Sequence, residues 1–129
     1  VHPGAIRAAL RAIPRLYVVT DSTSATGMPD GEYRLGSQHV TKCLGGVRLS
    51  DGTLAGSTLT MEDALRNLVS LGLPLEDVSN RMSRHAADYL GLEDRGRLVR
   101  GAWADVVVFE RDLTLAATYV EGEQIVEYA

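Results

Sequence analysis

The stretch RLYVVTDSTSATGMPDG, residues 15–31, runs from an apolar segment into a single acid and then into small, polar and turn-forming residues. Leu16–Thr20 has the β-branched and aromatic content of a buried strand, whereas the residues after Asp21 are typical of a loop. A carboxylate where a strand meets a loop is a common place for chemistry in α/β enzymes. A lone Asp at this place is more often a turn or cap residue, because its oxygen accepts nearby backbone N–H groups.

The composition is that of a soluble globular protein. The chain has 129 residues, 45% of them hydrophobic and 23% charged, which is enough for one ordinary domain. A net charge of −4 gives no electrostatic attraction for nucleic acid or for an anionic membrane surface, so we expect neither as a partner. The apolar runs are far shorter than the roughly 20 residues that span a bilayer.

The single cysteine indicates the compartment. Cys43 cannot form an internal disulfide, which favours the reducing cytoplasm, and it is interpreted as a small strand residue. The chain starts with Val1 rather than Met, and Val1-His2-Pro3 is typical of a loop already in progress. We therefore expect a fragment of a longer protein.

The first half of the chain predicts a helix, a strand and then a hairpin region. Apolar residues at helical spacing predict a helix over Pro3–Ile13, which leads directly into the strand at Leu16–Thr20. A β-hairpin excursion is predicted over residues 31–50, with turns at Gly45-Gly46 and Asp51-Gly52. Its strands are predicted at Glu32–Leu35, His39–Leu44 and Val47–Leu49.

The second half predicts helices followed by strands. Thr60 caps a helix with Asp63 as the capping-box acid, and Gly72 ends it. A second helical region opens at Pro74 and stops at Gly91, with one shared face: Val78, Met82, His85, Ala86, Tyr89 and Leu90. A strand over Ala104–Phe109 and a hairpin around Glu121-Gly122 follow, with a boundary near Gly96 to Gly101.

Most catalytic motifs are missing from the sequence. His2, His39 and His85 are far apart, so no zinc or iron site is recognisable within the chain. There is no GxSxG element around Ser22, Ser24 or Ser57 and no glycine-rich phosphate loop. The basic residues Arg95, Arg97 and Arg100 are interpreted as a solvated face. Asp21 is left as the candidate, because the small residues after it leave space for a ligand.

Three segments carry a family resemblance. VTD at 19–21, GTLAGSTLTMEDALRNLV at 52–69 and GRLVRGAWADVVVF at 96–109 resemble the C-terminal portion of the N-acetylglucosamine-6-phosphate deacetylases of the amidohydrolase superfamily. The GxLxxGxxAD pattern is shared across that superfamily, whereas GTLAGSTLTM after VTD is much more specific to the deacetylases. The resemblance covers essentially the whole chain.

The resemblance implies an α/β fold, the C-terminal fragment of a (β/α)8 barrel plus part of a small β-sandwich domain. Residues 1–95 would belong to the metal-dependent hydrolase barrel, with the hairpin excursion at 31–50. Residues 96–129 would supply C-terminal strands of the β-sandwich domain. Leu16–Thr20 would be the eighth barrel strand and Asp21 would stand at the catalytic mouth.

The resemblance also implies site residues. Asp21 would be the catalytic acid and base, taking a proton from the attacking water and returning it to the leaving amine. Leu54, Ala55 and Gly56 match a segment that contacts the sugar, although for Gly56 a turn before the Thr60 cap is an equal interpretation. The family's divalent metal, zinc or iron, is held by residues from earlier strands, so no ligand is expected in this chain.

The expected function is hydrolysis of the acetamide of N-acetylglucosamine 6-phosphate by a cytoplasmic homodimer. The isolated chain is expected to be inactive, because one barrel strand cannot satisfy its edges without neighbours. Two alternatives stay open. One is another amidohydrolase, such as an amino-acid deacylase or a cyclic-amide hydrolase, and the other is a non-catalytic interaction domain.

Overall fold

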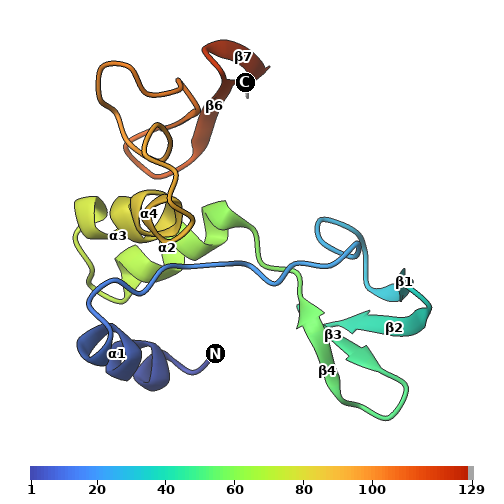
Figure 1. The fold of residues 1–129 in the computed structure, drawn as a ribbon. Coiled ribbons are helices and arrows are strands. Elements are labelled where there is room, and N and C mark those ends of the chain that lie inside the picture. The colour runs from blue at the N-terminus through green and yellow to red at the C-terminus, as the bar shows by residue number, and fades with distance from the viewer. Residues whose placement is uncertain (128–129) are drawn as a thin grey trace. The chain divides into compact units, whose positions relative to one another are not determined.

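The structure of the protein is a computed structural model that describes residues 1–127. The chain divides into two compact units. One unit combines Val1–Val18 with the chain from Leu65 onward, and the other is Val19–Ala64. Each unit contains one antiparallel sheet, so the α/β class is confirmed at this level (Figure 1).

The unit Val19–Ala64 contains a four-stranded antiparallel sheet in the order β1-β2-β3-β4. The strands are β1 (Gly31–Leu35), β2 (Gln38–Cys43), β3 (Gly46–Leu49) and β4 (Leu54–Ser57). The three predicted strands are confirmed, but the excursion does not end at residue 50. Strand β4 is not among the predicted strands, because a four-residue segment with a glycine in its interior has little strand character.

The turns of this sheet follow from backbone angles that glycine adopts easily. Leu44 and Gly45 have φ of 50° and 76° and join Cys43 to its partner Gly46, as two-residue hairpin turns require. This turn lies one residue earlier than predicted. The turn at Asp51-Gly52 is confirmed, with φ of 86° at Gly52.

The loop after Asp21 packs against the sheet of its own unit. Ala25 is fully buried with Val40 and Val47, and Ala55 lies against this cluster. The Lys42 ammonium group donates to the carbonyl oxygen of Ala25 (3.2 Å), and the Tyr33 hydroxyl donates to that of Pro29 (2.7 Å). The loop is therefore a packed part of the unit.

The other unit contains the helices α1 (Pro3–Ala12), α3 (Leu75–Met82) and α4 (Arg84–Tyr89), together with most of α2 (Met61–Ser70). Its core is formed by Leu65, Leu68 and Val78, with partly buried apolar neighbours that include Ile6 and Val18. The helices predicted from Pro3 and from Thr60 are confirmed, with α1 ending one residue before the predicted Ile13. No helix in residues 1–127 has both the length and the apolar character needed to cross a membrane.

The prediction of a single helical region after Pro74 is wrong in one respect. The backbone breaks at Ser83 (φ −134°, ψ −72°), so that α3 and α4 are separate helices. Tyr89 and Leu90 are 71% and 68% exposed and do not share the buried face of Val78. The break changes the direction of the helical face, which a continuous 3.6-residue period cannot anticipate.

The prediction of a strand at Leu16–Thr20 is also wrong for the structure of residues 1–127. Its backbone is bound by helix residues instead: the Val18 N–H donates to the carbonyl oxygen of Arg81 (3.0 Å), and the Arg81 guanidinium donates to that of Leu16 (3.1 Å). A strand needs a neighbouring strand to pair with, and within residues 1–127 no strand forms a ladder with this segment.

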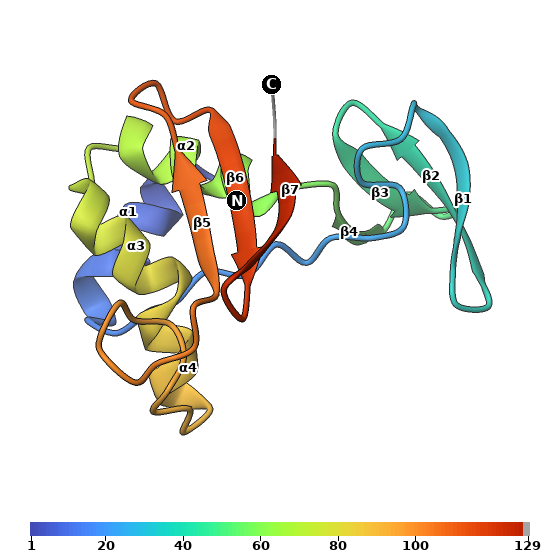
Figure 2. The ribbon, with the colours of Figure 1, turned by 90° about the horizontal axis from the view of Figure 1, so that it is seen from above.

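The second sheet pairs β5 (Val106–Phe109), β6 (Leu115–Val120) and β7 (Glu123–Glu127) in that order, and Figure 2 shows them side by side. The predicted hairpin around Glu121-Gly122 is confirmed, with φ of 53° and 87°. Asp105 secures its turn, because the carboxylate accepts the Glu121 N–H (2.9 Å) and also pairs with Arg95. This gives the aspartate of the GxLxxGxxAD pattern a structural role.

The Thr60 cap should stabilise the protein measurably. The Asp63 N–H donates to Thr60 Oγ1 (3.0 Å) and the Thr60 hydroxyl donates to the Asp63 carboxylate (2.9 Å). We expect Thr60→Ala to lower the free energy of unfolding by about 1 kcal/mol and Thr60→Ser to retain most of it. Urea unfolding followed by circular dichroism measures both, and equal losses in the two variants would contradict the capping role.

Asp51 should titrate below its ordinary range. The Thr53 N–H donates to its carboxylate (2.9 Å), and this bond, followed by that of the Thr53 hydroxyl, lowers the pKa of Asp51 from the ordinary value of 3.8. A lowered pKa in the folded state stabilises the turn above the unfolded value, and this stabilisation is lost as the pH falls through the folded pKa. NMR titration should give a midpoint below 3.8 that Thr53→Ala raises only in part. A midpoint at or above that value would refute the turn geometry.

Candidate functional site

Asp21 lies at the start of the loop that precedes the four-stranded sheet. Its backbone has φ of 52°, a left-handed conformation, and its side chain is exposed. Asp and Asn enter this region more readily than other residues that carry a side chain, yet the conformation still costs roughly 1–2 kcal/mol. Such strain persists only when the surrounding structure holds it, and it is often found at functional positions.

The end of β4 supplies the contacts that hold Asp21. The Ser57 N–H donates to the carbonyl oxygen of Asp21 (2.8 Å), and the Thr23 N–H donates to that of Ser57 (3.0 Å). Ser22 and Ser57 form a parallel bridge. The segment that carries Asp21 therefore runs along the end of β4, within one unit of the structure.

Gly56 is the residue that permits this close approach. It is buried in β4 with φ of 151°, and a Cβ atom there would lie 2.6 Å from Thr23 Cγ2 and 3.3 Å from the carbonyl oxygen of Asp21. A Cβ at 2.6 Å is not tolerated without movement. Gly56 is thus a strand residue beside Asp21, and the interpretation as a simple turn before Thr60 is wrong.

The four residues predicted as site residues are only partly brought together. Asp21 and Gly56 are adjacent, with the Asp21 carboxylate 4.0 Å from the position of a Gly56 Cβ. Ala55 is half-buried and packs on the apolar cluster of the sheet. Leu54 is 63% exposed and pairs with Arg48 in the ladder. The catalytic and substrate-contacting roles stay predictions.

The Asp21 carboxylate forms no hydrogen bond or ion pair with any of residues 1–127. A carboxylate without a donor keeps both oxygens available as acceptors for a water molecule or a ligand. Its position depends on the backbone that carries it, because no side chain in the described part of the chain holds it. The geometry is suited to accepting and returning a proton at one oxygen atom.

The histidines are occupied by structural contacts. His2 Nδ1 accepts the Gly4 N–H (3.0 Å) at the start of α1, His39 is exposed and lies 3.5 Å from the Arg34 guanidinium, and His85 Nδ1 lies 3.4 Å from the carbonyl oxygen of Leu16. Residues 1–127 contain no group of three His, Cys, Asp or Glu side chains placed to hold a metal ion. The described residues therefore do not fit a metal centre by themselves.

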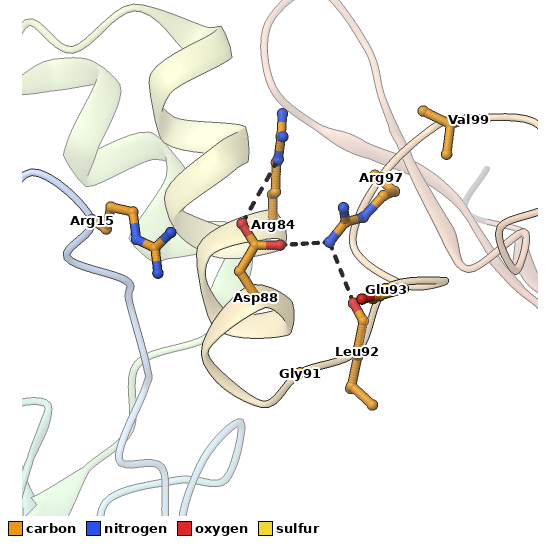
Figure 3. Close-up of a pocket in the computed structure, with 8 residues that line it drawn as sticks. All are labelled: Arg15, Arg84, Asp88, Gly91, Leu92, Glu93, Arg97 and Val99. Atoms are coloured by element: carbon orange, nitrogen blue, oxygen red, sulfur yellow. Dashed lines mark hydrogen bonds and ion pairs between the residues drawn. The ribbon is translucent and has the colours of Figure 1, made fainter.

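A polar pocket lined in part by Asp88 lies in the unit that contains α3 and α4 (Figure 3). Asp88 accepts a hydrogen bond from Arg97 (2.5 Å) and lies 3.9 Å from Arg84, and Arg97 also donates to the carbonyl oxygen of Leu92. Together with the pairing of Arg95 to Asp105, this corrects the interpretation as a solvated face for Arg95 and Arg97, whereas Arg100 is exposed. Arg95 and Arg97 have carboxylate partners and hold the segment before β5.

Ser57 and Thr23 are the residues of this site that sequence reasoning missed. The sequence presents Ser57 only as a possible nucleophile, and nothing in its neighbours indicates a structural link to residue 21. The available signal was the glycine directly before it, because a glycine within a strand marks a close approach of two backbones.

Gly56→Ala should destabilise the unit Val19–Ala64. We expect a loss of about 2 kcal/mol or more in the free energy of unfolding, from the positive φ and the clash with Thr23 Cγ2. Thr23→Ser removes that methyl group, so Gly56→Ala should cost less in the Thr23→Ser background. Denaturant unfolding of the four proteins forms the double-mutant cycle. Strict additivity of the two changes would contradict the close approach.

Known proteins with similar sequences indicate the family of the chain. No family model matches it. It is 39% identical over 125 residues to an N-acetylglucosamine-6-phosphate deacetylase of Lysinibacillus sphaericus, covering 95% of this chain and 32% of that protein. It is 36% identical over 126 residues to an Escherichia coli K12 protein with the provisional name N-acetylgalactosamine-6-phosphate deacetylase, covering 95% of this chain and 75% of that protein.

Solved structures agree with these relatives. The N-acetylglucosamine-6-phosphate deacetylase of Thermotoga maritima superposes with a TM-score of 0.93 at 34% identity, covering 99% of this chain and 36% of that one. A mutant of the Mycobacterium smegmatis enzyme in complex with N-acetyl-D-glucosamine-6-phosphate gives a TM-score of 0.88 at 36% identity, covering 98% and 35%. The chain spans about a third of the length of most of these relatives. It belongs to the family of N-acetylhexosamine-6-phosphate deacetylases that these relatives represent.

Proposed function

We propose that the protein carrying this sequence hydrolyses the acetamide of N-acetylglucosamine 6-phosphate to glucosamine 6-phosphate and acetate. Membership of the deacetylase family supports the reaction class. The observation that carries the proposal is the Asp21 carboxylate, which is held by a strained backbone beside Gly56 and has no partner among residues 1–127. A strained backbone conformation at a residue whose side chain makes no stabilising contact is often found at functional sites.

Asp21 acts in this proposal as the proton carrier. One carboxylate oxygen accepts a proton from the water that attacks the acetamide carbon. The same oxygen returns the proton to the nitrogen when the C–N bond breaks, so that the product leaves as a neutral amine and not as an unstable anion. A positioned acid and base of this kind contributes roughly 10²- to 10⁴-fold to the rate.

A divalent metal, zinc or iron, is implied by the family resemblance. It would polarise the acetamide carbonyl group and favour ionisation of the attacking water. Residues 1–127 provide no group of three ligands, so such an ion would be held by parts of the longer protein outside this chain. Asp21 is assigned to proton transfer and not to metal binding.

Leu54, Ala55 and Gly56 are proposed to contact the sugar. Gly56 supports this by letting β4 lie against the segment that carries Asp21, so that a ligand at the carboxylate would be beside the end of that strand. Leu54 is 63% exposed, so its side chain is accessible to a ligand. A ligand lying along β4 would meet the Asp21 carboxylate at the end of that strand.

The longer protein is proposed to form a (β/α)8 barrel with a small β-sandwich domain, as a cytoplasmic homodimer. Residues 1–95 would belong to the barrel and 96–129 to the β-sandwich domain. The extended segment Leu16–Thr20 supports this, because a strand that lacks neighbours in the described chain would acquire them from other barrel strands. The isolated chain is expected to be inactive.

N-acetylgalactosamine 6-phosphate is a second candidate substrate. Two Escherichia coli relatives named for that substrate are 36% identical to the chain, against 39% for the Lysinibacillus sphaericus protein. The two sugars differ only in the configuration at one carbon, so the proton transfer by Asp21 would be the same. Measuring kcat/KM on both phosphates decides between them.

Asp21→Asn should abolish most of the activity without affecting stability. We expect kcat for acetate release to fall by roughly 10²- to 10⁴-fold, because an amide cannot carry the proton. Asn tolerates the positive φ as well as Asp does, and the carboxylate has no partner among residues 1–127, so the unfolding temperature should hardly change. The measurement uses the gene product that contains this sequence.

Asp51→Asn is the matched control. Asp51 is an exposed loop aspartate in the same unit, and an asparagine oxygen can still accept the Thr53 N–H. Its activity should stay within about twofold of the unchanged protein, the usual size of effect for a surface change. If Asp21→Asn hydrolysed the substrate at a similar rate to this control, Asp21 would not be the proton carrier.

A further inference from the structure

Ser57 is bonded to both peptide groups that flank the Asp21 Cα atom. Its hydroxyl donates to the carbonyl oxygen of Thr20 (2.5 Å), which belongs to the peptide before Asp21. Its backbone N–H donates to the carbonyl oxygen of Asp21 (2.8 Å), which belongs to the peptide after it. The angles φ and ψ of a residue are the rotations of these two planes about its Cα, so one residue restrains both angles of Asp21.

The hydroxyl of Ser57 uses its single donor and also accepts a hydrogen bond. Besides donating to Thr20, it accepts the Leu59 N–H (3.1 Å), and the side chain is half-buried. A hydroxyl that donates to one fixed group and accepts from another is locked in a single rotamer. Ser57 therefore holds the peptide between Thr20 and Asp21 in one orientation.

The neighbouring contacts reinforce this arrangement. The carbonyl oxygen of Ser57 accepts the Thr23 N–H (3.0 Å) and lies 3.3 Å from the Thr23 hydroxyl. Gly56 lets the strand pass this closely. These contacts keep β4 against the loop even without the Ser57 hydroxyl, so the hydroxyl can be removed while the rest of the attachment stays.

We propose that Ser57 is a positioning residue for proton transfer by Asp21, which rests on the proposed function. The carboxylate has no side-chain partner within residues 1–127, so its place is determined by the backbone conformation that Ser57 fixes. A proton carrier must lie within hydrogen-bond reach of the reacting water, and a displacement of about 1 Å can cost about 100-fold in rate.

Ser57→Ala tests the proposal in the gene product that contains this sequence. It removes the bond to the Thr20 carbonyl and the acceptor of the Leu59 N–H, and it keeps the backbone bonds to Asp21 and Thr23. We expect kcat on N-acetylglucosamine 6-phosphate to fall by about 10-fold or more, with KM changed by less than about twofold, because binding is kept and proton transfer is impaired. Ser57→Thr, which keeps a hydroxyl, should stay within about threefold of the unchanged protein.

A double-mutant cycle with Asp21→Asn separates positioning from a general loss of structure. A residue that acts through Asp21 has nothing to position once the carboxylate is gone, so Ser57→Ala should cost less than about twofold in the Asp21→Asn background. A full 10-fold loss in that background would overturn the proposal. Ser57→Cys, nearly the same size with a weak donor, replaces Ser57→Ala in the cycle if the alanine variant does not fold.

Ser24→Ala is the matched control. Ser24 lies on the same loop, and its hydroxyl donates to the carbonyl oxygen of Arg34 (2.9 Å), away from the Ser57 contacts. Its kcat should remain near that of the unchanged protein. If Asp21→Asn is inactive while Ser57→Ala and Ser24→Ala are equally active, the positioning role fails and the proposed function stands. If Asp21→Asn keeps full activity, the proposed function itself fails.

Discussion

Two hydrogen bonds from Ser57, one from its hydroxyl and one from its N–H, hold the peptide groups on both sides of Asp21. They keep an aspartate in a left-handed backbone conformation that an unrestrained chain would leave. The other features of the unit serve this contact. Gly56 allows β4 to approach the loop closely, and Thr23 binds the Ser57 carbonyl oxygen from the loop. The turn at Asp51-Gly52 joins β3 to β4, which pairs Ser57 with Gly46 at the end of its strand.

The sheet of residues 19–64 is the support for the loop. Ala25 is fully buried on Val40 and Val47, so the loop that begins at Asp21 is anchored in an apolar cluster a few residues farther on. The exposed Asp21 carboxylate is therefore carried by a packed loop and sheet. This packing lowers the entropic cost of positioning the carboxylate for a reaction. The unit that contains the helices has its own apolar core and its own polar contacts, among them the pairing of Arg97 with Asp88.

Sequence patterns over a few residues predicted the elements that are stabilised by contacts between nearby residues. The Thr60 cap, the three strands between residues 31 and 50 and the turn at Glu121-Gly122 depend on residues within a few positions of each other, and all are present. The failures depend on distant partners. Leu16–Thr20 has strand character but pairs with no strand in the described chain. The hydrogen bond between Ser57 and Thr20 joins residues 37 positions apart. Asp21 was identifiable as a candidate, whereas the residues that hold it were not.

The most direct measurement is a crystal structure of the gene product with an analogue of the hydrolysed substrate. The account predicts that Asp21 keeps a positive φ, that the Ser57 hydroxyl is bonded to the carbonyl oxygen of Thr20, and that one Asp21 carboxylate oxygen lies about 2.6–3.2 Å from the oxygen that stands in for the attacking water. An Asp21 in an ordinary extended conformation, or with its carboxylate turned away from the ligand, would contradict it.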